Sequence, residues 1–271
     1  MRWRTQSSIA IGGDGADYAL INASPDIRAQ ILATPELQPG RAPRDTGIAG
    51  VVLMDAQIDH VTGLLMLRES PRPLPLYCTA RVYEDLTQHL PIINILQHYC
   101  GVEWHEISPD GRAFKLAGVD DVEFSAIPLI SKAPPYSPHR EDPQPGDNLG
   151  LIATDRHSGK RAFYAPGLAV IDQTVAAAMA QAEVILVDGT CWHDDDMARA
   201  GVGTKFSRDM GHLPQHGDGG MLEVLRGYPD ARRVLIHINN TNPILDEHSA
   251  PRATLAGLGI DVAHDGQLIE V

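Results

Sequence analysis

Hydrophobic runs of strand length recur along most of the chain and alternate with segments of helical spacing. Continuous apolar runs at residues 48–54, 184–187 and 234–236 are typical of buried strands, which we expect over residues 48–54, 183–188 and 233–238. Shorter patterns predict further strands at residues 8–11, 18–21, 74–78, 103–107, 113–116, 122–127, 149–154 and 161–164. Apolar spacing and capping residues predict helices at residues 27–32, 62–67, 81–89, 92–99, 171–180, 220–226 and 249–258.

This order of elements predicts a layered α/β domain with a sandwich of two sheets inside. Each half of the chain passes from strands to helices, and neither a linker nor a short-period repeat separates the halves, so we expect one domain over residues 1–271. Two long segments lack periodicity: the proline-rich residues 131–145 and the polar, glycine-bearing residues 189–215. We expect both to be loops, and loops of this length are often functional.

Composition and charge narrow the classes of partner. The 271 residues carry a formal net charge of −13, which argues against nucleic acid as the main ligand because phosphate binding needs a basic face. Cys78, Cys100 and Cys191 are widely separated, which is typical of a reducing compartment. The start, Met1 to Arg4, leads into polar residues instead of a signal-peptide core. We expect a cytoplasmic protein without membrane insertion; a homodimer is left open.

Three apolar strands end abruptly in residues that bind metals or protons. The first leads into Asp59 and His60, another ends in Asp188, and a third ends in His237. Asp59, His60 and His237 together offer two imidazoles and one carboxylate, the ligand set of non-haem Fe(II) with open positions. The same set holds catalytic Zn(II) in other proteins. The alternative is structural: Asp59 as a helix cap beside a surface His60, and His237 as a hydrogen-bonded core histidine.

Other polar residues give weaker signals. His212 lies in a glycine-rich loop, where a solvated histidine is the ordinary case, and Pro214 argues against a helical metal pair of His212 with His216. Neither a Gly-x-Ser-x-Gly nucleophile motif nor a phosphate loop occurs in the sequence. The chemistry therefore depends on the three strand ends.

The turn after residue 54 resembles that of the metallo-β-lactamase superfamily. That superfamily carries His-x-His-x-Asp-His followed by glycine, and this sequence reads Asp55-x-Gln57-x-Asp59-His60 before Gly63. The resemblance implies an αββα sandwich. It also implies ligand roles for Asp59, His60 and His237, while the two preceding histidines are replaced. The superfamily's bridging aspartate would fall near residues 164–167, where no acid occurs.

Longer strings are similar to one family within this superfamily, the B proteins of pyrroloquinoline quinone (PQQ) biosynthesis. They are Arg-Thr-Gln-Ser-Ser at 4–8, Asn-Ala-Ser-Pro-Asp-Ile-Arg at 22–28, the turn at 55–60, and His-Ile-Asn-Asn-Thr-Asn-Pro at 237–243. Members usually begin with an additional strand and a cysteine cluster that binds a structural zinc. Neither precedes Met1, so the resemblance does not carry that zinc over to this sequence.

The resemblance implies one of three activities. The first is hydroxylation, with Fe(II) and O₂, of the tyrosine ring of a cross-linked Glu–Tyr precursor; the others are carriage of PQQ or its precursor towards the periplasm, and mononuclear zinc hydrolysis. A single metal on Asp59, His60 and His237 favours the first. We expect His212, Asn240 and Asp188 to orient ligands at that site. Arg140 and Lys205 are candidate partners for substrate carboxylates, with a solvated surface role as the alternative.

Overall fold

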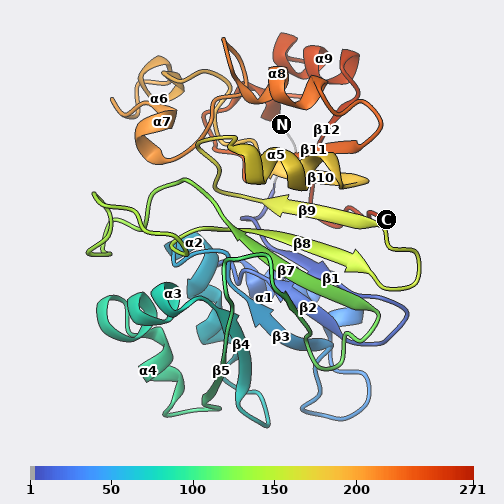
Figure 1. Ribbon diagram of the computed structural model, residues 1–271. Helices are drawn as coiled ribbons and strands as arrows, with labels where there is room; N and C mark the ends of the chain where they lie inside the picture. Colours follow the sequence, from blue (N-terminus) through green and yellow to red (C-terminus); the bar gives the residue numbers. More distant parts are fainter. Residues whose placement is uncertain (1–3) are drawn as a thin grey trace.

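Two β-sheets packed face to face form the centre of the molecule (Figure 1), as seen in a computed structural model that describes residues 4–271. The basic start of the chain therefore lies mostly outside the described residues. The first sheet has the strand order β1-β2-β3-β4-β5 and the second β12-β11-β10-β9-β8-β7-β6. The first five strands are β1 (Ile9–Ile11), β2 (Tyr18–Ile21), β3 (Ile48–Val52), β4 (Leu74–Cys78) and β5 (Val102–Glu106). The other seven are β6 (Ala113–Phe114), β7 (Val122–Pro128), β8 (Leu149–Asp155), β9 (Arg161–Ala165), β10 (Val184–Asp188), β11 (Arg232–Ile236) and β12 (Ile260–Val262).

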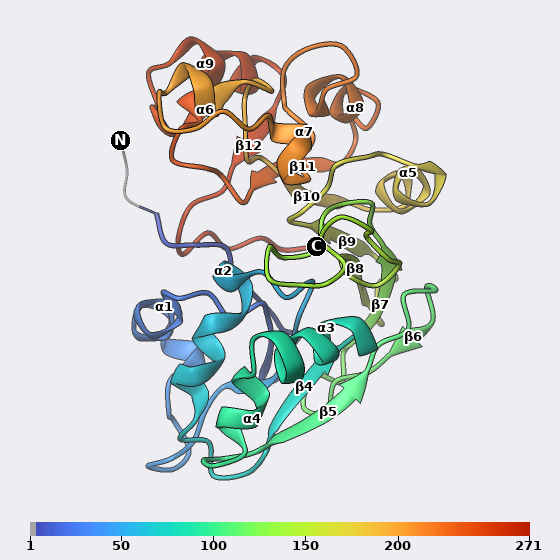
Figure 2. The ribbon, with the colours of Figure 1, turned by 90° about the vertical axis from the view of Figure 1, so that its left-hand side faces the viewer.

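Helices cover the outer face of each sheet (Figures 1 and 2). Over the first sheet lie α1 (Ile27–Ala33), α2 (Ile58–Val61), α3 (Ala80–Glu84) and α4 (Ile92–Leu96), with 3₁₀ segments at Pro35–Leu37 and Thr62–Leu67 and a π-helical turn at Asp85–His89. Over the second lie α5 (Gln173–Ala180), α8 (Met221–Arg226) and α9 (Ala250–Gly257), with a 3₁₀ segment at Pro243–Leu245. The expected αββα order of layers is therefore confirmed.

Both faces of the central strands are buried, which explains their continuous hydrophobic runs. In β10, Val184 and Leu186 point into the cluster between the two sheets, whereas Ile185 and Val187 point into the cluster under α5, α8 and α9. Successive side chains of a strand face opposite sides, so a strand covered on both sides is apolar at every position. A third cluster joins the first sheet to α1–α4 and includes Leu53 and Val61.

Strand direction places the ends of distant strands together. β2, β3, β4 and β5 run parallel to one another, and so do β9, β10, β11 and β12. The carboxyl ends of β3, β10 and β11 therefore meet at one rim of the sandwich. A ligand site in such folds is built where strand ends converge, because the strands hold the side chains rigidly.

The two long segments predicted to be loops differ from each other. Residues 131–145 contain neither helix nor strand, as predicted; Ser131, Ala133 and Ser137 are buried, whereas residues 141–143 are exposed. Residues 189–215 contain two short helices, α6 (Asp196–Arg199) and α7 (Ser207–Met210). Both are single turns, too short to produce the periodicity by which helices are found.

One expected helix also changes its winding. The α-helix predicted over residues 81–89 ends at Glu84 and continues as the π-helical turn. Thr87 Oγ1 donates to the carbonyls of Tyr83 and Glu84, at 2.8 and 3.1 Å, and side chains that bond to the preceding turn in this way compete with regular helix bonding. Within residues 4–271, no helix is long and apolar enough to cross a membrane.

Candidate metal centre

The turn after β3 is fixed by hydrogen bonds before it presents any ligand. The Asp55 carboxylate accepts from the Gln57 backbone N–H at 2.9 Å, and His60 N–H donates to the Gln57 carbonyl at 2.9 Å. Behind the turn, Gly63 lies so close to the chain after β2 that a Cβ there would be 2.1 Å from the carbonyl oxygen of Ser24. Glycine is therefore needed at position 63 to seat the turn against its neighbour.

His60 is held by one carboxylate and faces another. Its Nδ1 lies 2.7 Å from Asp55 Oδ1, and its Nε2 lies 3.8 Å from Asp59 Oδ2. The His60 side chain is 1% exposed. Burial by itself would lower its pKa, but the carboxylates, Asp55 foremost, outweigh burial and raise the pKa of His60 to about 9. Nδ1–H donates to Asp55, so Nε2 is the ring atom directed at the site.

His237 reaches the same point from the end of β11. Its backbone adopts a left-handed conformation with φ of 53°, which is unusual for a residue with a side chain and is found at functional sites. Its Nε2 lies 3.3 Å from Asp59 Oδ2, and its Nδ1 lies 2.9 Å from Thr190 Oγ1. The Thr190 hydroxyl has one proton, and it is 2.6 Å from a carboxylate oxygen of Asp188. Thr190 therefore donates to Asp188 and accepts from His237 Nδ1–H, and Nε2 is the ring atom of His237 that faces Asp59.

One ligand atom each from Asp59, His60 and His237 lies within 4.8 Å of the others. Burial alone would raise the pKa of Asp59, but the hydrogen bond from His237 and the charge of His60 hold it well below its usual range. His60 Nε2 is buried and has no hydrogen-bond partner among the described residues. Two ring nitrogens that converge on one carboxylate need a cation between them, a proton or a metal ion. These donors fit Fe(II) or Zn(II).

A second acid–histidine pair stands beside the first set. Asp188, fully buried, accepts at Oδ2 from His212 Nδ1 at 2.5 Å and from the Leu168 N–H at 3.1 Å. Burial would raise the pKa of Asp188, but His212 and His237 hold it below its usual value. Burial would likewise lower the pKa of His212, yet Asp188 raises it. With Nδ1 on Asp188, His212 presents Nε2 to the cavity, where it can accept or donate a proton.

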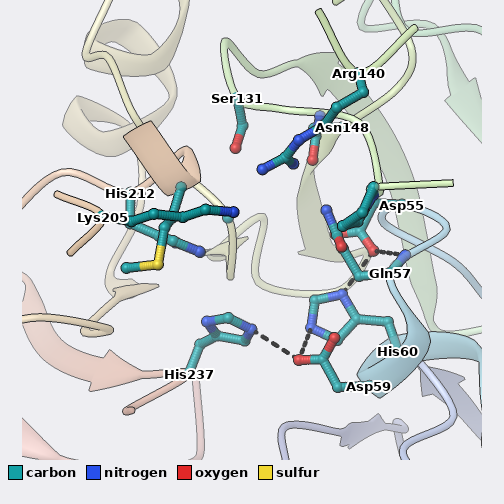
Figure 3. A pocket seen from close by; sticks show the side chains of 13 residues that line it. Asp55, Gln57, Asp59, His60, Ser131, Arg140, Asn148, Lys205, His212 and His237 are labelled. Atoms are coloured by element: carbon teal, nitrogen blue, oxygen red, sulfur yellow. Dashed lines mark hydrogen bonds and ion pairs between the residues drawn. The ribbon is translucent and has the colours of Figure 1, made fainter. Parts of the chain in front are cut away.

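A cavity of about 260 Å³ joins these groups (Figure 3). Asp59, His60 and His237 lie along one side of it. Arg140 and Asn148 lie on the opposite side, and Lys205 reaches in from the loop before α7. The lining residues are Asp55, Gln57, Asp59, His60, Ser131, Pro135, Arg140, Asn148, Gly167, Lys205, Met210, His212 and His237.

The structure brings together most of the residues expected from the sequence. Asp59, His60, His237 and His212 line the cavity, and Asp188 lies directly behind His212. Asn240 is different, because it is exposed in the turn after β11 and is absent from the cavity lining. The nearby Asn242 is buried instead, where its Nδ2 donates to the Gly189 carbonyl at 2.8 Å.

Two residues of the site were not found from the sequence. Thr190 links Asp188 to His237, and Asn148 lines the cavity directly before β8. Thr190 stands two positions after the strand-end Asp188, so its proximity to that acid was a usable signal. Asn148 gave none, because an asparagine in a proline-rich loop is ordinary turn chemistry.

Comparison with known proteins accounts for this arrangement. The model of a family described as "Beta-lactamase superfamily domain" matches residues 18–238. The coenzyme PQQ synthesis protein B of Cupriavidus taiwanensis is 59% identical over 98% of this chain and 87% of its own length. That of Methylococcus capsulatus is 55% identical with the same coverage. The chain belongs to the coenzyme PQQ synthesis protein B family.

Solved structures agree with this family. The crystal structure of Zn²⁺-bound PqqB from Methylobacterium extorquens has a TM-score of 0.88 and 36% identity, covering 100% of this chain and 89% of that one. A diphosphatase of the PhnP family (TM-score 0.67, 18% identity, 99% and 85% coverage) and the short form of human tRNase Z (0.62, 11%, 98% and 92%) share the fold. The expected metallo-β-lactamase-like sandwich is confirmed.

Proposed function

We propose that the protein acts in PQQ biosynthesis and uses one metal ion to hydroxylate the tyrosine ring of a cross-linked Glu–Tyr precursor. The names of its relatives support the pathway. Asp59, His60 and His237 would hold the metal. When bound, Fe(II) on two histidines and one carboxylate would keep open positions and supply O₂ activation. One oxygen atom enters the ring and the other leaves as water, so the reaction takes two electrons from an external reductant.

The observation that carries this proposal is that the described residues offer one complete ligand set with available donor atoms. Asp55 and Gln57, which stand where the superfamily has two further histidines, are already engaged: Asp55 bonds to His60 Nδ1, and Gln57 Nε2 donates to the Lys132 carbonyl at 3.2 Å. The set of Asp188, His212 and His237 shares a histidine with the first, and both oxygens of Asp188 accept hydrogen bonds. Two-metal hydrolysis needs a second set of ligands that is not engaged in this way.

The chain's own groups then prepare the substrate. His212 Nε2 is placed to take the proton of the phenol hydroxyl, and Asp188 stabilises the imidazolium that forms, as a buried carboxylate does for a general base. The raised pKa of His212 suits it to hold that proton. A phenolate ring is richer in electrons than a phenol and reacts more readily with an oxidant.

Mononuclear zinc hydrolysis is the second candidate. The pairing of His212 with Asp188 favours it, because the same base that deprotonates a phenol also deprotonates a water molecule. The Zn²⁺ in the Methylobacterium extorquens relative is compatible with it. A hydrolase would act without O₂, which separates the two candidates by experiment.

The test is anaerobic loading with Fe(II) and addition of the cross-linked Glu–Tyr compound with a two-electron reductant, ascorbate. O₂ is then admitted, and its consumption and the hydroxylated product are measured. Removing the hydrogen-bond partner of a metal ligand lowers metal affinity or activity by roughly 10- to 100-fold. Removing a ligand itself, in Asp59→Ala or His237→Ala, should lower activity by more than that. His98→Ala, which changes an exposed histidine after α4, should match the wild type.

Three results would contradict the proposal in different ways. Equal O₂ uptake in wild type, Asp59→Ala and His237→Ala would show that Asp59 and His237 do not bind the metal. Turnover of a scissile analogue by the Zn(II) protein without O₂ would favour the hydrolase. Tight binding of PQQ or the precursor without any turnover would favour a carrier.

A further inference from the structure

The cavity has a second polar side that the metal and proton chemistry does not use. Opposite Asp59, His60 and His237 lie Arg140 and Asn148, and the ammonium group of Lys205 points towards the same space (Figure 3). This is notable in a chain with a formal net charge of −13. Cations collected inside the cavity of an acidic protein indicate a ligand that carries negative charge.

Arg140 is positioned but lacks an acidic partner. Its Nη1 donates to the Ala133 carbonyl at 2.6 Å, which fixes the guanidinium. Among residues 4–271, no carboxylate forms an ion pair with Arg140 or with Lys205. The remaining N–H groups of Arg140 form a planar fork that matches the two oxygens of a carboxylate.

Asn148 adds donors that the protein leaves unused. Its side chain is 4% exposed, and its Nδ2 is buried without a hydrogen-bond partner among the described residues. A buried amide without a partner costs free energy unless a ligand or water satisfies it. Because the described residues give this amide no bond that holds it, a half-turn about χ2 directs either end at the cavity.

The cationic side is held at a fixed separation from the ligand set. The loop that carries Arg140 is tied to the metal turn at two points: Gln57 Nε2 donates to the Lys132 carbonyl, and the Tyr136 hydroxyl donates to the Ala56 carbonyl. Asn148 directly precedes β8, whose first residue, Leu149, donates from its N–H to the Met54 carbonyl at 2.8 Å. A ligand that binds to one side of the cavity is therefore held at a fixed position relative to the other side.

We propose that Arg140 and Asn148, with Lys205 at the mouth, form a carboxylate-binding subsite that sets which part of the substrate meets the metal-binding side chains. This rests on the proposed function only for the identity of the substrate. Carboxylate is favoured over phosphate because Asp55 and Asp59 line the same cavity and repel a dianion more strongly than a monoanion. Arg140 and Asn148 act here as specificity-determining residues that bind the unreactive end of the substrate.

The first test measures binding without turnover. Calorimetry on the Zn(II)-loaded protein under nitrogen compares the cross-linked Glu–Tyr compound with its methyl esters, and glutarate with inorganic phosphate. Loss of a hydrogen bond to a charged group costs on the order of tenfold to a hundredfold in affinity, which is expected for Arg140→Met and Asn148→Ala. Arg226→Met, on the exposed face of α8, is the matched control and should bind as the wild type does.

The decisive comparison removes the charge of the ligand's carboxylate and the charge of Arg140, separately and together. Esterification of the Glu–Tyr compound should weaken its binding to the wild type. It should not weaken binding to Arg140→Met any further, because that variant has already lost the interaction between Arg140 and the carboxylate. Equal affinity of wild type and Arg140→Met for the acid would overturn the subsite. Phosphate binding tighter than glutarate would overturn its assignment to carboxylates.

Turnover separates this inference from the proposed function. With Fe(II) and O₂, Arg140→Met should raise KM by about tenfold or more with a smaller change in kcat, and Arg140→Lys should recover part of the loss. If no variant or wild type consumes O₂ but the affinity pattern holds, the hydroxylase proposal fails and the subsite stands. If O₂ uptake depends on Asp59 while Arg140→Met leaves KM unchanged, the subsite fails alone.

Discussion

His60 Nδ1 lies 2.7 Å from Asp55 Oδ1, and both side chains are almost fully buried. This contact sets the tautomer of the histidine and turns its Nε2 towards Asp59 and His237. Asp55, at a position where the superfamily carries a metal-binding histidine, therefore orients His60, one of the candidate ligands. Asp55 thus bonds to His60 and does not stand free as a ligand itself.

Replacement of Asp55 should weaken metal binding without removing a ligand. In Asp55→Ala the ring of His60 loses its orienting acceptor, and such losses lower metal affinity by roughly 10- to 100-fold. The buried Nδ1–H is also left without a partner, which costs about 1–3 kcal/mol of unfolding free energy. Competition against a chromophoric chelator and urea unfolding measure the two effects. Asp110→Ala, at an exposed position, serves as the control, and unchanged affinity in Asp55→Ala would contradict the orienting role.

The stability of the metal-free protein should fall as the pH rises from about 6.5 to 9. Burial opposes the charged form of His60, but Asp55 and Asp59 raise its pKa from 6.5 to about 9. A raised folded-state pKa stabilises the protein fully below the unfolded value and loses that contribution as the pH passes the folded value. Urea unfolding of the metal-free protein at several pH values measures this. His60→Gln should flatten the profile over that interval, and a persistent slope would assign it to another group.

Metal affinity should show the opposite dependence on pH. The metal must displace the proton from His60 Nε2, so affinity increases with pH, by up to about tenfold per unit, until the pH passes the raised pKa. Titration with Zn(II) in a non-coordinating buffer between pH 6.5 and 9 measures the trend. An affinity independent of pH over that interval would mean that His60 is neutral before the metal binds.

Thr190→Val should loosen the site while preserving its volume. The hydroxyl bonds to Asp188 Oδ1 and to His237 Nδ1, so its loss removes the acceptor that directs His237 Nε2 at Asp59. Metal affinity should fall by roughly tenfold or more, and Thr190→Ser should restore most of it. Full affinity in Thr190→Val would show that the backbone at His237, and not this hydroxyl, fixes the ring.

Asp188→Asn should lower the protonation midpoint of His212. The Asp188 carboxylate is the nearest charge that raises the pKa of His212 against the effect of burial, so its neutral isostere removes that support. NMR titration of the histidine Cε1–H signals measures the midpoint, with His212→Gln to assign the resonance. Circular dichroism checks that the variant is folded. An unchanged His212 midpoint in Asp188→Asn would show that Asp188 is not the partner of the proposed base.

The sequence by itself determined the layers of the fold and the chemistry of the candidate ligand set. Runs such as residues 184–187 are apolar at every position because both faces of the strand are covered, and that property is visible in the sequence. Asp59, His60 and His237 stand at the ends of such runs, where rigid strands deliver side chains to one rim. Local patterns were sufficient for these features because they depend on burial and on neighbouring positions.

Only the tertiary structure decided which other polar residues join the site. Asn240 follows the same strand as His237, but the turn leaves it exposed. Thr190 and Asn148 enter the site because the chain folds them against Asp188 and the cavity. Asp55 is 2.7 Å from His60 as an orienting acceptor, a role that its position in the motif alone does not reveal. These contacts join residues that no local sequence pattern relates to each other. They are determined by packing and hydrogen bonding in the folded protein.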